Sequence, residues 1–141
     1  METAVVLVVE SEALIRMSAL HIVEDAGYAA VGASHADEAI AILNDRRDIR
    51  AVFTDVRMPG TMDGMRLAAA IRRRWPPIHL LVTSGVNVSA GEEFSANWRF
   101  ISKPYSAEHV TAALRELFDS HPAPLRLIAG GGGNRGRVAR Q

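Results

Sequence analysis

Short apolar runs alternate with longer, helix-like stretches along most of this 141-residue chain. The runs have the length of strands and occur at residues 4–9, 28–33, 51–54, 78–82 and 98–101. A run as continuously apolar as VVLVV at residues 5–9 is typical of parallel sheets that are covered on both faces. The alternation therefore predicts an α/β fold, a doubly wound parallel sheet of five strands with (βα)5 organisation.

Five helices are predicted between and after these strands. Ser11 is a good N-cap for the first helix, which ends before Gly27, and Ser34 is a good N-cap for the second. The fourth helix should be short, because Asn, Ser and Gly lower its helix propensity. The remaining bounds are about 11–26 for the first helix, 64–75 for the third, within 86–96 for the fourth and 106–120 for the fifth.

The chain has the length of one domain, which we place at residues 1–120. Residues 121–141 contain prolines, a run of four glycines and arginines, with too little apolar surface to offset the entropy of ordering. We expect these residues to form a flexible tail. Residues 120–141 carry four arginines and no acid, so a basic docking arm is the alternative.

The composition excludes several classes of protein. The chain has no cysteine, so it has no disulfide framework and no thiolate metal site. No apolar stretch reaches the roughly 18 residues of a spanning helix, and the N-terminus lacks the basic start of a secretion signal. We expect a soluble, cytoplasmic protein without membrane contact. Four histidines share no metal-ligand spacing and are expected at the surface, namely His21, His35, His79 and His109.

Polar residues follow four of the five predicted strands. They are Glu10, Asp55, Thr83-Ser84 and Lys103-Pro104. The carboxyl ends of parallel strands share one edge of a sheet, where ligands bind, so these residues should converge. An aspartate there can cap a helix, bind a metal or accept a phosphoryl group. Lys103 is the single lysine among 16 basic residues, which favours a role that needs a compact point charge.

The motifs at these strand ends resemble the receiver domain of two-component response regulators, of the single-domain, chemotaxis-regulator type. The matching segments are VLVVE at residues 6–10, DVRMPG at 55–60, Asp63-Gly64, Thr83-Ser84-Gly85 and Lys103-Pro104. The resemblance covers residues 4–119 and implies a flavodoxin-like strand order, 2-1-3-4-5. It also implies a phosphoprotein that is not an enzyme beyond its own phosphoryl transfer and dephosphorylation.

The resemblance implies a role for each residue at the strand ends. Asp55 would accept a phosphoryl group from a histidine kinase or a histidine phosphotransfer protein, and Lys103 would neutralise a phosphoryl oxygen. Thr83 would donate its hydroxyl to that group, while Ser84 is small enough to leave the pocket open. Pro104 would follow a cis bond. The alternatives are a surface role for Lys103 and a simple turn at Thr83-Ser84.

The resemblance also implies Mg²⁺, held by Glu10, by Asp55 and by the backbone carbonyl of Arg57. Ser11 departs from the family pattern, because the second residue of the acidic pair is usually an aspartate that binds the metal directly. Losing one carboxylate beside a divalent ion weakens affinity, so we expect weak Mg²⁺ binding. The loop at residues 59–64 is one residue longer than the commonest family form, while Arg57 and Gly85 occupy positions that tune phosphoryl lifetime.

Phe100 occupies the family's aromatic switch position, with ordinary core packing as the alternative reading. No room for a DNA-binding or enzymatic domain follows residue 119, so we expect a stand-alone receiver without nucleic-acid binding. The resemblance implies that its output is contact with a downstream protein partner through the face formed by the fourth helix, fifth strand and fifth helix, and that a homodimer could form through this face. The alternative is a pseudo-receiver that acts independently of phosphorylation because of Ser11. A haloacid-dehalogenase-type phosphatase is disfavoured, because Arg57 stands where those enzymes need a second aspartate.

Overall fold

The computed structural model describes residues 4–55, 64–84 and 98–120. Five parallel strands form one sheet in the order β2-β1-β3-β4-β5, which confirms the predicted fold and strand order. The strands are β1 (Val5–Val9), β2 (Ala29–Ala33), β3 (Ile49–Asp55), β4 (His79–Ser84) and β5 (Trp98–Ser102). The described helices are α1 (Ala13–Asp25), α2 (Ala36–Asp45), α3 (Gly64–Arg74) and α4 (Ala107–Ser120). The helix expected within 86–96 and the tail at 121–141 lie outside the described residues, so α4 is the fifth predicted helix.

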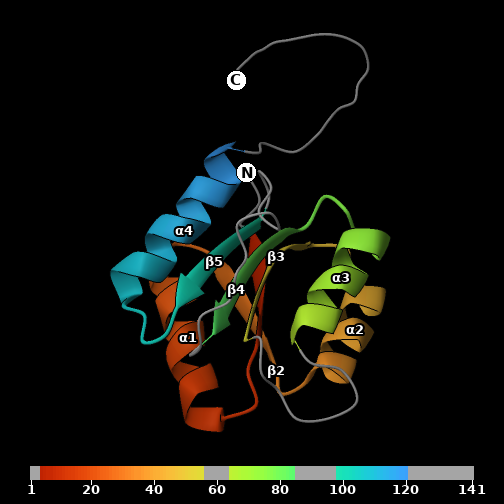
Figure 1. Cartoon of the computed structure of the whole chain (residues 1–141), viewed down its shortest axis with the longest axis horizontal. Helices are drawn as coiled ribbons and strands as arrows, with labels where there is room; N and C mark the ends of the chain where they lie inside the picture. Colours follow the sequence, from red (N-terminus) through yellow and green to blue (C-terminus); the bar gives the residue numbers. More distant parts are fainter. Residues whose placement is uncertain (1–3, 56–63, 85–97, 121–141) are drawn as a thin grey trace, which may run out of the picture.

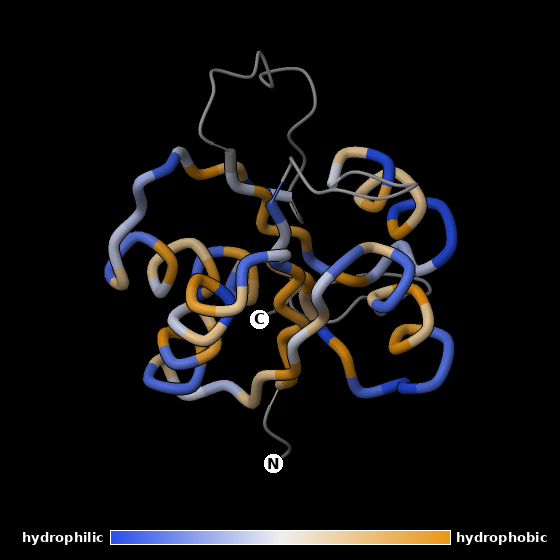
Figure 2. Tube along the Cα trace, turned by 90° about the horizontal axis from the view of Figure 1, so that it is seen from below, coloured by the Kyte–Doolittle hydropathy of each residue, from blue (hydrophilic) through white to orange (hydrophobic). Residues whose placement is uncertain are grey.

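The helices cover the sheet in two layers. Helices α2 and α3 lie on one face, and α1 and α4 lie on the other (Figure 1). Apolar residues gather along the strands at the centre, while polar residues mark the outer sides of the helices (Figure 2). Because both faces are covered, the central strands β1, β3 and β4 are buried along most of their length, as their continuous apolar sequence predicts, while the edge strands β2 and β5 are partly exposed.

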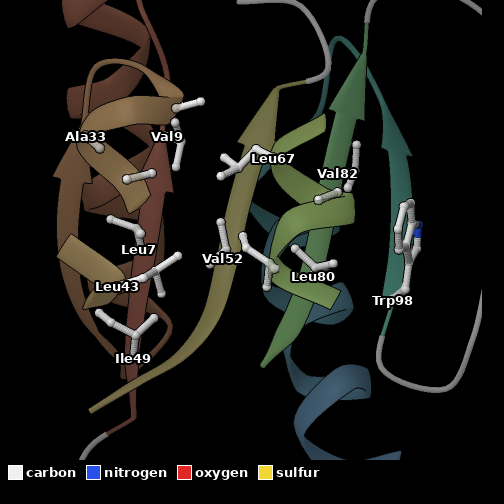
Figure 3. Packing of buried hydrophobic residues seen from close by; sticks show 14 of the residues in the cluster. Leu7, Val9, Ala33, Leu43, Ile49, Val52, Leu67, Leu80, Val82 and Trp98 are labelled. Carbon is white, nitrogen blue, oxygen red and sulfur yellow. The ribbon is translucent and has the colours of Figure 1, made fainter. Parts of the chain in front are cut away.

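Alternate residues of each strand supply two hydrophobic clusters. On the first face, Val52 and Leu80 pack against helix residues such as Leu67 (Figure 3). On the second face, Phe53 and Leu81 pack against residues from α1 and α4. The sheet is therefore shared by two cores, which pack against it from both sides.

Two helix starts differ from the predicted ones by a single residue. The N-cap of α1 is Glu12, with no side-chain cap, so the predicted cap at Ser11 is wrong. The N-cap of α2 is His35, whose Nδ1 accepts a hydrogen bond from Glu38 N, so the predicted cap at Ser34 is also wrong. The end of α1 agrees with the prediction, because Gly27 takes a positive φ of 105°.

His79 is buried, against the expectation that the histidines lie at the surface. It begins β4, is 6% exposed and makes an edge contact with the Phe118 ring at 4.9 Å between centroids. No helix in the described part of the chain is long and apolar enough to cross a membrane.

Candidate functional site

The predicted site residues meet at the carboxyl edge of the sheet. Asp55 is the last residue of β3 and pairs in register with Thr83 of β4. Glu10 follows β1 directly, and Lys103 follows β5 directly. Glu10 and Asp55 are each only 6% exposed, which is rare for carboxylates and marks a site rather than an ordinary surface.

Lys103 forms an ion pair and a hydrogen bond with Asp55, its Nζ donating to Oδ2. The peptide bond between Lys103 and Pro104 is cis, as the resemblance implied. Partial burial acts to lower the pKa of Lys103, but the hydrogen bond and charge of Asp55, with the charge of Glu10, outweigh it and raise that pKa. The ammonium is therefore charged at neutral pH, and the surface role considered for this lysine is wrong.

Thr83 presents a buried hydroxyl at the same edge. The residue is 2% exposed, and its Oγ1 has no hydrogen-bond partner among the described residues. Thr83 and Asp55 line a small pocket together with Glu10. A buried hydroxyl without a partner is unfavourable by about 1–3 kcal/mol, so this donor is available to a group that enters the pocket.

The Glu10 carboxylate is held by the backbone that follows it. Its Oε2 accepts a hydrogen bond from Glu12 N at 3.0 Å, and its carbonyl accepts one from Arg16 Nη1 at 2.8 Å. These contacts fix the turn between β1 and α1. Ser11 lies in that turn, partly exposed, without a capping role.

The donor set at this edge fits a hard divalent cation. No cluster of three or more histidine, cysteine or acidic residues occurs in the described ranges. Mg²⁺, however, is commonly bound by one or two carboxylates with several waters, and Glu10 and Asp55 supply two. The third predicted ligand, the carbonyl of Arg57, lies outside the described residues.

The remaining predicted residues are only partly placed. Ser84 ends β4 opposite Ser102, and its side chain lies outside the description. Phe100 of β5 is partly buried and packs against the cluster on the α2 and α3 face. Gly85 and the longer loop at 59–64 lie outside the described residues, apart from Gly64 at the start of α3.

Tyr105 belongs to the same pocket and was missed by the sequence analysis. It lines the pocket beside Glu10 and Asp55, and its ring meets the Phe53 ring edge-on at 5.5 Å. Burial of the ring, followed by the negative charge of Glu10, raises the pKa of Tyr105. Its position in the sequence could have indicated this role, because Tyr105 directly follows Lys103-Pro104 at the carboxyl end of β5.

Comparison with known proteins identifies the family that shares these features. The family model described as the response regulator receiver domain matches residues 6–115. The hydrogenase transcriptional regulatory protein HoxA of Cupriavidus necator is 31% identical over 121 residues, which cover 83% of this chain and 24% of that protein.

Two solved structures share the fold. The response regulator receiver protein from Sinorhizobium medicae WSM419 has a TM-score of 0.76 at 23% identity, covering 84% of this chain and 96% of its own. The chemotaxis protein CheY4 of Vibrio cholerae has a TM-score of 0.73 at 24% identity, covering 82% and 99%. The chain spans between 13% and 47% of the length of four curated relatives.

Proposed function

Because the chain belongs to the response regulator receiver domain family, we propose that Asp55 accepts a phosphoryl group from the phosphohistidine of a partner protein. The observation that carries this proposal is the buried Thr83 hydroxyl, which has no partner among the described residues and shares a pocket with Asp55. A phosphoryl group on Asp55 would give that hydroxyl an acceptor. The Lys103 ammonium already lies at the same carboxylate.

The reaction is an in-line phosphoryl transfer. An oxygen of the Asp55 carboxylate attacks phosphorus, the bond from phosphorus to the donor imidazole nitrogen breaks, and an acyl phosphate forms. Lys103 then faces the new phosphoryl oxygens and stabilises their charge, and Thr83 Oγ1 donates a hydrogen bond to one of them. Neither residue forms a covalent bond, so the chain contributes positioning and electrostatics.

Glu10 and Asp55 would hold Mg²⁺, with water and the backbone carbonyl of Arg57 as further ligands. When bound, the ion neutralises charge on the transferring phosphoryl group. Ser11 removes one carboxylate from this set, so we propose weak binding. A Ser11→Asp variant should bind Mg²⁺ at least about tenfold more tightly in a titration, and equal affinities would contradict the assignment of this position.

The partners follow from the family as proposals. The first helix is the usual docking site for a histidine kinase or phosphotransfer protein, and α1 exposes Leu14 at 81% and Met17 at 54%. Residues three apart on a helix share a face, so these two form an apolar contact surface. Output would reach a downstream protein, or a second copy of the chain, through a surface change that involves Thr83 and Phe100. In this proposal the protein is cytoplasmic.

Phosphoryl acceptance is tested with a small-molecule donor. We expect the full chain, incubated with acetyl phosphate and Mg²⁺, to gain one hydroxylamine-sensitive phosphoryl adduct by intact mass spectrometry. Asp55→Asn should abolish the adduct, and Asp45→Asn, a change at an exposed aspartate of α2, should leave it intact. An adduct that survives in Asp55→Asn would assign the chemistry to another residue.

A second candidate function rests on Ser11. If the missing carboxylate prevents metal binding, the domain acts as a pseudo-receiver whose contacts do not depend on phosphorylation. In that case neither the native chain nor Asp55→Asn would gain an adduct at any Mg²⁺ concentration. Recovery of the adduct in Ser11→Asp would then show that this one position disables the site.

A further inference from the structure

A second pocket lies at the opposite edge of the sheet from Asp55. It has a volume of about 460 Å³ and is formed by the C-terminal ends of α2 and α3, the start of β3 and the connection into β4. Ile49 lines it at one end of β3, and Asp55 stands at the other end. Asp55 lies six positions after Ile49 along the strand, about 20 Å away, so this pocket is separate from the phosphoryl site.

Four arginines and no acidic residue line this pocket. Asp48, which does not line the pocket, holds the Arg46 side chain in place. Arg46 Nε and Nη2 donate to the two carboxylate oxygens of Asp48 at 2.9 and 2.7 Å. Arg74 donates to Asn44 Oδ1 at 2.9 Å, which holds its guanidinium between the two helix ends. The other two are Arg47 and Arg50, both exposed.

A bulge in β3 places Arg50 at this rim. Val5 pairs with Ile49 and the next residue, Val6, pairs with Ala51, so Arg50 is an extra residue on β3. A bulge turns a side chain out of the regular alternation of a strand. Arg50 is accordingly exposed between two buried neighbours, and its Nη1 donates to the carbonyl of Arg47 at 3.2 Å.

The floor of the pocket is apolar and includes an indole. Trp75 and Ile78 are partly buried there, and Pro76 and Pro77 lie between them. The Arg74 guanidinium lies 4.5 Å from the centroid of the Trp75 ring. An indole beside a guanidinium offers planar surfaces for stacking, next to cations that suit phosphate.

We propose that this arginine-lined pocket binds a nucleoside phosphate. Its volume is in the range of small-ligand pockets, and it combines an apolar floor with a few convergent polar groups. Arginine forks bind phosphate through paired hydrogen bonds, and the planar surfaces at Trp75 suit a base. The chain's own residues 120–141 do not suit the pocket, because they carry four arginines and no acid.

Tryptophan fluorescence provides the test. The chain has two tryptophans, of which Trp98 is 3% exposed in the core and Trp75 lies in the pocket. We expect titration of the full chain with ADP, GDP or UDP to change the emission saturably, and Trp75→Phe to abolish that change. Adenosine alone and pyrophosphate alone should each bind at least about tenfold more weakly than ADP, because each fills half of the pocket.

Variants separate this site from general charge effects. The double variant Arg47→Gln, Arg50→Gln should weaken ADP binding at least about tenfold in isothermal calorimetry, the typical loss for a charge-assisted hydrogen bond. Neither arginine forms an ion pair in the described part of the chain, and the charge of Arg50 makes only a minor contribution to the lowered pKa of Asp48, so the fold should be retained, as circular dichroism would check. Arg73→Gln is the matched control, since Arg73 is exposed at the end of α3 and does not line the pocket.

Asp55→Asn should bind ADP as tightly as the native chain, so the result does not depend on the proposed phosphoryl acceptance. Three outcomes would overturn the inference. They are no binding of any of the three nucleotides at millimolar concentration, equal affinity in the double arginine variant, and pyrophosphate binding as tight as ADP binding, which would leave only a general anion site.

Discussion

The Thr83 hydroxyl is buried and has no hydrogen-bond partner among the described residues. Substitutions at this position should therefore affect stability and phosphorylation differently. Thr83→Val keeps the shape and removes the polar group, so we expect the free energy of unfolding to rise by about 1 kcal/mol. Thr83→Ala leaves a small cavity and should lower it by about 1 kcal/mol. Urea denaturation measures both changes.

The same two variants should behave alike in phosphorylation, because both lack the donor. We expect each variant to form less of the acetyl phosphate adduct than the native chain, or to hydrolyse the adduct faster than the native chain does. If Thr83→Val were destabilising by 1 kcal/mol or more, the hydroxyl would have a partner in the folded protein. Full retention of the adduct would remove Thr83 from the proposed mechanism.

Tyr105 reports the charge of the pocket through its own titration. Burial and the charge of Glu10 raise its pKa, and the Lys103 ammonium opposes them. Glu10→Gln removes a negative charge, so the pKa of Tyr105 should fall. The measurement is tyrosinate absorbance against pH in a Tyr28→Phe background, which leaves Tyr105 as the single tyrosine.

Glu12→Gln is the matched control for this titration, because it removes the same charge from an exposed neighbour in sequence. Its effect on the Tyr105 titration should be smaller than that of Glu10→Gln. Since the folded pKa of Tyr105 is raised, the folded state retains the proton longer than the unfolded state. Stability should therefore decline as pH rises above about 10, the ordinary tyrosine pKa.

The start of α2 depends on three side chains. Ser34 donates to Glu38 Oε1 from both its backbone nitrogen and its hydroxyl, each at 2.8 Å, and His35 Nδ1 accepts from Glu38 N. We expect Glu38→Ala to lower the free energy of unfolding by about 1 kcal/mol at neutral pH, the usual size of a capping contribution. Urea denaturation against pH measures it.

The pH dependence has a definite sign. The hydrogen bonds from Ser34 lower the pKa of Glu38, so the stability they give is present above the unfolded pKa, about 4.5, and is lost as pH falls through the lower folded value. The difference between Glu38→Ala and the native chain should shrink in that window. A difference that is constant down to pH 2 would show that charge on Glu38 is irrelevant.

These helix starts also show where sequence reasoning stops. The strands could be predicted because their apolar runs pack into the two clusters, but the caps could not be placed to the residue. Ser34 and His35 are neighbours, and either side chain can accept a hydrogen bond; the structure uses Ser34 as a donor to Glu38 instead. At the start of α1, Glu10 Oε2 accepts a hydrogen bond from Glu12 N, and Ser11 lies one residue before the N-cap instead of occupying it.

At the scale of the whole molecule, strand ends decide what the sequence can predict. The carboxyl edge collects a polar motif from four of the five strands, so Glu10, Asp55, Thr83 and Lys103 could be grouped from their positions at the strand ends. No comparable rule predicts which residues meet at the opposite edge of the sheet. Its arginines meet through two helix ends and a bulge at Arg50, and none of these is visible as a pattern along the chain.

The two clusters on either side of the sheet should unfold together, because each strand contributes to both. Leu67 belongs to the cluster on the α2 and α3 face and Leu114 to the cluster on the α1 and α4 face, and both are 0% exposed. We expect Leu67→Ala and Leu114→Ala each to lower the free energy of unfolding by about 3 kcal/mol.

Leu14→Ala is the matched control, because Leu14 is 81% exposed and its truncation should change stability by less than about 0.5 kcal/mol. Urea unfolding would be followed by tryptophan emission, which includes Trp98 in the first cluster, and by far-ultraviolet circular dichroism, which reports all helices. The two transitions should coincide in every variant, since the clusters share one sheet. If Leu114→Ala moved the dichroism transition ahead of the emission transition, the two faces would be independent folding units.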